Sequence, residues 1–184
     1  MAIDYIALWA LVIIDTLGLL LVVRQLATLP QYTRQGSARE RRGPAIGSPI
    51  ADWSLAALEG GIKNDRDLAS SYTLLFVAST CDPCHKLLAE LRKTGRPAGP
   101  LYLVANGDPQ SVAAEARIDG ERLYDELLIT GSGDLYQRLD VPGTPYAIAV
   151  RGRHVAGAGV SPTAADLARI AASAEFVAEQ AAAS

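Results

Sequence analysis

Two cysteines and a histidine stand close together in the stretch Cys81-Asp82-Pro83-Cys84-His85. A C-x-x-C-H pattern is typical of c-type haem attachment, in which both thiols are alkylated and the histidine binds iron. A C-x-x-C pattern between a strand and a helix is typical instead of a thioredoxin-like dithiol whose sulfurs cycle between thiol and disulfide. The stretch alone is compatible with both interpretations, so the surrounding elements must decide.

The residues around the pair predict a strand, a turn and a helix. Residues 72–78, YTLLFVA, are a short apolar run rich in aromatic and branched side chains, which predicts a buried strand. Residues 82–94 predict a helix with a leucine stripe on one side. Unpaired N–H groups and the helix dipole favour a thiolate at such a helix start. We therefore expect Cys81 to be the nucleophile and Cys84 the cysteine that resolves the mixed disulfide.

Three neighbours are candidates for tuning the thiols. The carboxylate of Asp82 disfavours a nearby thiolate, whereas a protonated His85 favours one. Pro83 is tolerated because a residue in the first helical turn has no helical hydrogen bond to lose. The alternative for His85 is a solvent-exposed helix residue without a role.

Haem and zinc are the competing uses of the cysteines. A haem needs a second axial ligand or an open site, and Met1 and His154 are the remaining methionine and histidine. The motif also follows a predicted strand, whereas c-type haem domains are usually helical. Zinc would need Cys81, Cys84, His85 and His154 together, but adjacent residues on a helix point in different directions. We expect no metal and no cofactor other than the redox-active disulfide.

The remaining pattern predicts an α/β layered domain. The expected elements are a strand at 100–105, a helix at 109–116, a strand within 123–129, a short helix at 133–139, a hairpin of 145–150 and 153–160, and a final helix with Ser161 as its N-cap, Pro162 at its first position and Val177 on its buried side.

The amino terminus predicts a membrane anchor. Residues 5–23 are apolar apart from Asp15 and are close to the roughly 20 residues that span a bilayer. A cleaved signal peptide would need a basic start and a small-residue cleavage site, which this segment lacks. Asp15 is either a protonated carboxyl tolerated in the helix or a contact with another membrane subunit. The predicted organisation is an anchor at 1–26, a linker at 27–49 and a domain at 50–184.

The linker is rich in arginine, which bears on topology. Positive residues normally remain cytoplasmic, so this rule favours a cytoplasmic domain. The same side chains could contact anionic headgroups of the lipid bilayer; they are Arg24, Arg34, Arg39, Arg41 and Arg42. The formal net charge of −3 gives no reason to expect nucleic-acid binding.

The chain resembles membrane-anchored thioredoxin-like proteins of the TlpA type, most closely the MauD-like accessory proteins of methylamine utilisation. The resemblance rests on the anchor ending in RQL, the G-P and S-P linker before ADWSLAALEG, LLFVASTCDPCHKLL, LYLVANGD, and TPYAIAV. It implies a thioredoxin-like three-layer α/β/α domain behind a single transmembrane helix. It also implies an extracytoplasmic domain that handles disulfides of client proteins. This location is opposite to the cytoplasmic one that the linker arginines favour.

The resemblance also implies roles for residues outside the cysteine motif. Pro145 would be a cis-proline packed against the disulfide, and the backbone of Thr144 would pair with a cysteine-containing client. Leu75 occupies the position at which thioredoxins bury an aspartate that moves protons. A membrane electron donor or acceptor would complete the cycle. The alternative function is a non-enzymatic thioredoxin-like scaffold subunit of a membrane complex.

Overall fold

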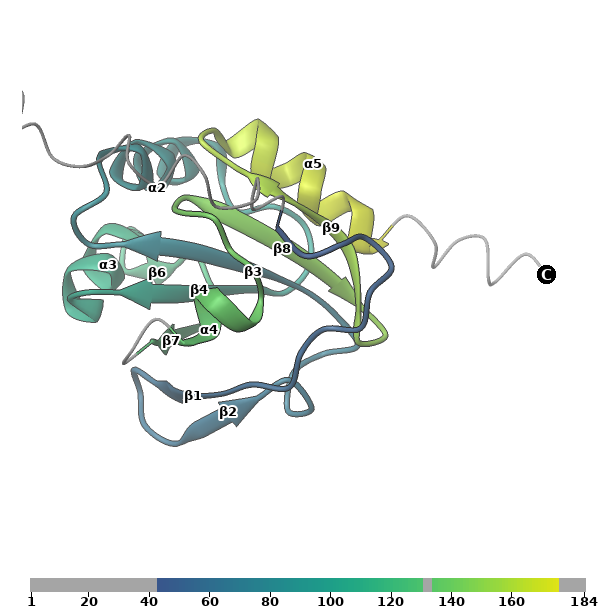
Figure 1. Ribbon diagram of the computed structural model, residues 1–184. Helices are drawn as coiled ribbons and strands as arrows, with labels where there is room; N and C mark the ends of the chain where they lie inside the picture. The colour runs from purple at the N-terminus through teal and green to yellow at the C-terminus, as the bar shows by residue number, and fades with distance from the viewer. Residues whose placement is uncertain (1–42, 131–133, 176–184) are drawn as a thin grey trace, which may run out of the picture. The chain divides into compact units, whose positions relative to one another are not determined.

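The computed structural model describes residues 43–130 and 134–175 (Figure 1). The elements are β1 (Ser54–Ala57), β2 (Ile62–Asn64), β3 (Ser71–Ala78), α2 (Asp82–Thr94), β4 (Leu101–Asn106), α3 (Pro109–Glu115), β5 (Arg117–Ile118), β6 (Glu121–Arg122), β7 (Glu126–Ile129), α4 (Asp134–Arg138), β8 (Tyr146–Arg151), β9 (His154–Val160) and α5 (Ala164–Glu175).

A mixed sheet organises this part of the chain, with the strand order β2-β1-β7-β4-β3-β8-β9. β3, β4 and β7 are parallel neighbours, as crossover connections through α2 and α3 require. β8 runs antiparallel to β3 and forms a hairpin with β9. The predicted strand at 72–78 is therefore an interior strand of the sheet, between β4 and β8, and its carboxyl end leads directly to the cysteines.

Apolar side chains cover both faces of the sheet. On one face, α2, α3 and α5 pack against alternate residues of the central strands, such as Leu75 and Val77. On the other face, α4 and residues 50–57 pack against the intervening ones, such as Leu74 and Phe76. The predicted three-layer α/β arrangement is thus present, although the second helical layer is the short α4 (Figure 1).

Two features of the fold differ from the sequence-based expectation. The β1–β2 hairpin and the small β5–β6 pair are additional strands. α5 begins at Ala164, and the hydroxyl of Thr163 accepts the N–H of Asp166, so the capping residue is Thr163 and not Ser161. Ser161 is instead fully buried, and its N–H donates to the carbonyl of Pro145.

The end of the expected linker is hydrogen-bonded to the hairpin. The N–H of Gly47 donates to the Val155 carbonyl at 2.7 Å, and the N–H of Val155 donates to the Ser48 carbonyl at 2.9 Å. Pro49 forms an isolated bridge with His154. These backbone groups extend the globular unit upstream of residue 50.

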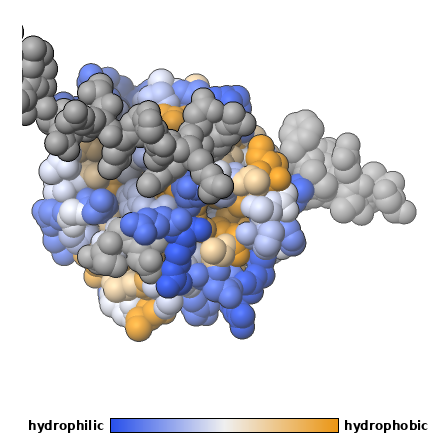
Figure 2. All heavy atoms as spheres, viewed as in Figure 1, coloured by the Kyte–Doolittle hydropathy of each residue, from blue (hydrophilic) through white to orange (hydrophobic). Residues whose placement is uncertain are grey.

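The predicted anchor at 1–26, its Asp15 and the position of Val177 lie outside the described residues. None of the helices described within 43–130 and 134–175 combines the length and the apolar composition of a membrane span. Figure 2 shows hydrophilic side chains over much of the visible surface, with small hydrophobic areas between them. The large apolar residues that the described surface exposes are Ile46, Ile62 and Val160.

Candidate functional site: a disulfide at the start of a helix

A turn of residues 79–81, called the active-site turn below, connects the buried strand β3 to α2. The strand ends at Ala78, whose carbonyl accepts the N–H of Cys81 at 3.2 Å. Cys81 is the N-cap of α2, and its carbonyl accepts the N–H groups of Cys84 and His85 at 2.9 and 3.1 Å. The turn therefore places the first sulfur at the positive end of a helix of 13 residues.

Cys81 and Cys84 form a disulfide with a Cα–Cα distance of 5.2 Å. Cys81 is partly exposed, whereas Cys84 is only 1% exposed and packs in the apolar core beneath α2. The N–H of Cys84 donates to Cys81 Sγ at 3.2 Å, a contact that stabilises negative charge on this sulfur. The accessible sulfur is thus also the one that the helix start favours as a thiolate.

The loop before β8 forms the opposite wall of the site. The Thr144–Pro145 peptide bond is cis, which is the backbone geometry that the resemblance implies. The carbonyl oxygen of Thr144 lies 3.6 Å from Cys81 Sγ, and Thr144 itself is partly exposed while Pro145 is buried. The structure therefore brings these two residues and the first cysteine together.

His85 is not a free surface residue. Its Nδ1 lies 2.5 Å from Oε2 of Glu115 at the end of α3, and the two side chains are 36% and 32% exposed. The hydrogen bond to Glu115 raises the pKa of His85, with a smaller electrostatic contribution from Asp82. Asp82 and Pro83 are exposed in the first turn of α2. Of the two interpretations of His85, a tuning residue or an exposed residue without a role, the contact with Glu115 is compatible with the first.

Glu115 belongs to the site although its sequence position does not indicate this. It lies 30 residues from His85, and its helix reaches the active-site turn only through the crossover from β4 to β7. The only sequence signal is that Glu115 stands near the end of a predicted short helix. That signal does not reveal which side chain of α2 it contacts.

Leu75 occupies the position at which thioredoxins bury a proton-transferring aspartate. It is fully buried in the same core cluster as Cys84, so no carboxyl group is supplied from this position of β3.

His154 lies in β9 and contacts the carbonyl of Gly152. Within the described residues, no cluster of three or more His, Cys, Asp or Glu side chains could hold a metal ion.

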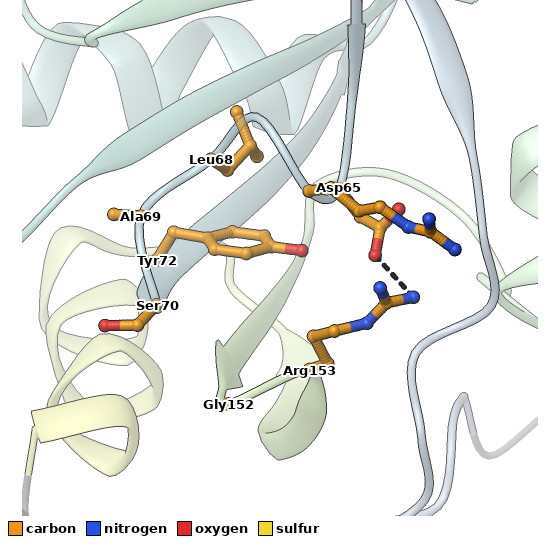
Figure 3. A pocket seen from close by; sticks show the side chains of 8 residues that line it. Asp65, Leu68, Ala69, Ser70, Tyr72, Gly152 and Arg153 are labelled. Atoms are coloured by element: carbon orange, nitrogen blue, oxygen red, sulfur yellow. Dashed lines mark ion pairs between the residues drawn. The ribbon is translucent and has the colours of Figure 1, made fainter.

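A hollow of about 390 Å³ lies near the start of β3, at the opposite end of the strand from the cysteines. Figure 3 shows Tyr72 and Arg153 beside Asp65. Arg153 pairs with the buried Asp65 at 2.8 Å and with the exposed Asp52 at 2.6 Å. Burial, followed by the charge of Asp65, raises the pKa of Tyr72. This network joins the β8–β9 turn to the segments before β1 and β3, which is a structural role.

Comparison with known proteins identifies the fold. No protein-family model matches the chain, and no curated protein matches its sequence. Solved structures do match it. The thioredoxin domain of the thiol-disulfide oxidoreductase BVU-2223 from Bacteroides vulgatus has a TM-score of 0.56 and 16% identity, over 72% of this chain and 98% of that one.

Two further structures agree with the first. A secreted disulfide oxidoreductase of Mycobacterium tuberculosis has a TM-score of 0.51 and 17% identity, over 73% of this chain and 98% of that one. A thio-disulfide isomerase from Thermus thermophilus has a TM-score of 0.51 and 20% identity, over 64% of this chain and 87% of that one. At these identities the similarity shows a thioredoxin-like α/β fold.

Proposed function

We propose that the chain is a membrane-tethered thiol–disulfide oxidoreductase that exchanges disulfides with client proteins. One observation carries the proposal: an accessible sulfur at a helix start is paired with a buried sulfur behind it, beside the Thr144 carbonyl. A disulfide that only stabilised the fold would not need an exposed sulfur at the end of a helix dipole. The similar structures include two disulfide oxidoreductases and a thio-disulfide isomerase, which supports the same chemistry.

The geometry suggests the order of exchange. In the reduced protein, the Cys81 thiolate attacks a client disulfide, forms a mixed disulfide and releases one client thiolate. The thiol of Cys84 then loses its proton and attacks Cys81 Sγ. This step restores the Cys81–Cys84 disulfide and releases the second client thiolate, so two electrons pass to the client. The reverse sequence oxidises a client dithiol.

Thr144 and Pro145 would receive the client. The Thr144 carbonyl lies beside the sulfur that is attacked, so an extended client segment that pairs with this backbone would bring its own sulfur to Cys81. The buried Pro145 contributes no N–H donor there and keeps the loop against the disulfide. The client is a cysteine-containing protein, and by resemblance to the MauD-like proteins its maturation would require correct disulfides.

Serine variants test the exchange. Cys84→Ser should accumulate mixed disulfides with clients on non-reducing gels, because the resolving thiol is lost, whereas Cys81→Ser should not. The double variant should abolish client maturation while the protein remains folded. Full activity of the double variant would contradict the proposal and support the scaffold function.

The membrane part of the proposal rests on residues 1–26. They would anchor the domain in the cell membrane, where a membrane electron donor or acceptor would renew the cysteine pair, and Asp15 would contact a transmembrane partner. The TlpA-type resemblance favours an extracytoplasmic domain. A topology reporter fused after Ser184 tests this side: an extracytoplasmic signal supports the proposal, and a cytoplasmic signal contradicts it.

A further inference from the structure

Both ends of helix α3 contact the cysteine segment: its start contacts the turn before Cys81, and its end contacts the first turn of α2. At its start, the backbone N–H of Asp108 donates to Ser79 Oγ at 3.0 Å. At its end, Glu115 Oε2 lies 2.5 Å from His85 Nδ1. The carboxylate of Asp108 also caps the helix by accepting the N–H groups of its first turn. Glu115 is therefore held in a defined position relative to the cysteines.

The charged groups that face His85 come from two helices. Glu115 reaches it from α3, and Asp82 acts on it from its own helix. The backbone of Ser79 adds a hydrogen-bonding contact from the turn. Strand β3 contributes Leu75 and Val77 to the apolar cluster that contains Cys84. The hydrogen bond to Glu115 and these charges raise the pKa of His85, whereas its partial burial lowers it. The backbone N–H of His85 also donates to the Cys81 carbonyl at 3.1 Å, so His85 lies next to both cysteines.

We infer that Glu115 holds His85 as a cation beside the cysteine pair, and that this cation stabilises the reduced, thiolate form of the pair. The inference rests on the proposed function, because it concerns the redox balance of the same two cysteines. His85 acts through its charge, and Glu115 is a positioning residue that maintains this charge near neutral pH.

The sign of the effect follows from the redox reaction. Two molecules of glutathione reduce the disulfide by two electrons, giving a dithiol and glutathione disulfide, and Cys81 then releases its proton to the solvent. The sulfurs carry no charge in the disulfide and one negative charge in this product. A neighbouring cation therefore favours reduction, and an unpaired carboxylate at the same place opposes it.

A cycle of variants in a glutathione redox buffer tests the inference in the full chain. At about pH 7.5, one unit above the ordinary histidine pKa, His85→Gln should shift the equilibrium constant three- to tenfold toward the disulfide. About that size is expected for one unit charge at a partly exposed site within a Debye length. His85→Lys retains a cation that Glu115 can pair with and should remain within about twofold of the wild type.

Glu115 is tested in the second half of the cycle. In Glu115→Gln, His85 loses its partner and is mostly neutral at this pH, so adding His85→Gln should change the equilibrium by less than about twofold. The inference is overturned if His85→Gln shifts the equilibrium toward the dithiol, or if it leaves the equilibrium unchanged. It is also overturned if the shift is equally large with and without Glu115. Failure of the wild-type pair to exchange with glutathione at all would instead refute the proposed function.

Discussion

The contact between Gly107 and Ser79 offers a sharp test of how α3 is joined to the active-site turn. Gly107 stands just before the helix with a φ of +90°, and a Cβ placed there would lie 2.3 Å from Ser79 Oγ. The same Oγ accepts the N–H of Asp108. The perturbation is Gly107→Ala. Gly120 provides a matched control, because its φ is +88° and a Cβ there would have no neighbour within 4 Å.

The two alanine variants should differ by the cost of the contact. A left-handed conformation costs a non-glycine residue about 1–2 kcal/mol, and this cost is common to Gly107→Ala and Gly120→Ala. Gly107→Ala should cost about 1–3 kcal/mol more, the range for adding a methyl group to a packed site. Ser79→Ala alone should cost about 1 kcal/mol, because it removes one hydrogen bond.

The double variant Ser79→Ala/Gly107→Ala completes the cycle. Loss of the hydroxyl removes the close contact, so the double variant should be more stable than the sum of the single effects predicts, by about 1–3 kcal/mol. Urea unfolding measures the wild type, the two single variants, the double variant and the Gly120→Ala control. Equal destabilisation by Gly107→Ala and Gly120→Ala, or strict additivity of the two changes in the cycle, would refute the contact.

Three further predictions concern stability. Arg153→Ala should cost about 3 kcal/mol in urea unfolding, because it leaves the buried Asp65 carboxylate without this cation; a loss under about 0.5 kcal/mol would contradict this. Thr163→Ala should cost about 1 kcal/mol of stability through loss of the α5 cap. Ser161→Ala should be nearly neutral, because its buried hydroxyl has no partner among the described residues. A larger loss of stability in Ser161→Ala than in Thr163→Ala would show that Ser161 is the cap. The pKa of His85 is raised in the folded state, so its stabilising contribution is complete below the unfolded pKa of about 6.5 and is lost as the pH rises through the folded value. The stability difference between wild type and His85→Gln should therefore shrink as the pH rises above about 6.5, and an increase would contradict the pairing.

Local patterns were sufficient to predict the elements that carry the cysteines. The apolar run before Cys81 and the leucine stripe after it correspond to β3 and α2, because a buried central strand and a packed helix need continuous apolar surface. Residues 54–57 and 62–64 each contain one large hydrophobic side chain, Leu55 and Ile62, and therefore gave no comparable signal for β1 and β2. These strands are short and lie at the sheet edge, where alternation is weakly expressed.

Contacts between side chains that are far apart in the sequence could not be predicted from the sequence alone. Ser161 and Thr163 are both good capping residues, and only the packing of the chain after β9 decides which hydroxyl reaches the helix N–H groups. The pairing of Glu115 with His85 depends on the crossover that places α3 beside α2. The cis bond before Pro145 was expected from the family resemblance, since propensity alone favours the trans form.

The most direct test of the central claim is the reduction potential of the Cys81–Cys84 disulfide. A thiol–disulfide exchanger should show a single two-electron transition between about −120 and −270 mV, the range of known exchangers. A potential below about −300 mV is typical of a structural disulfide. Such a value, or a disulfide that no thiol reductant opens in the folded protein, would contradict the account.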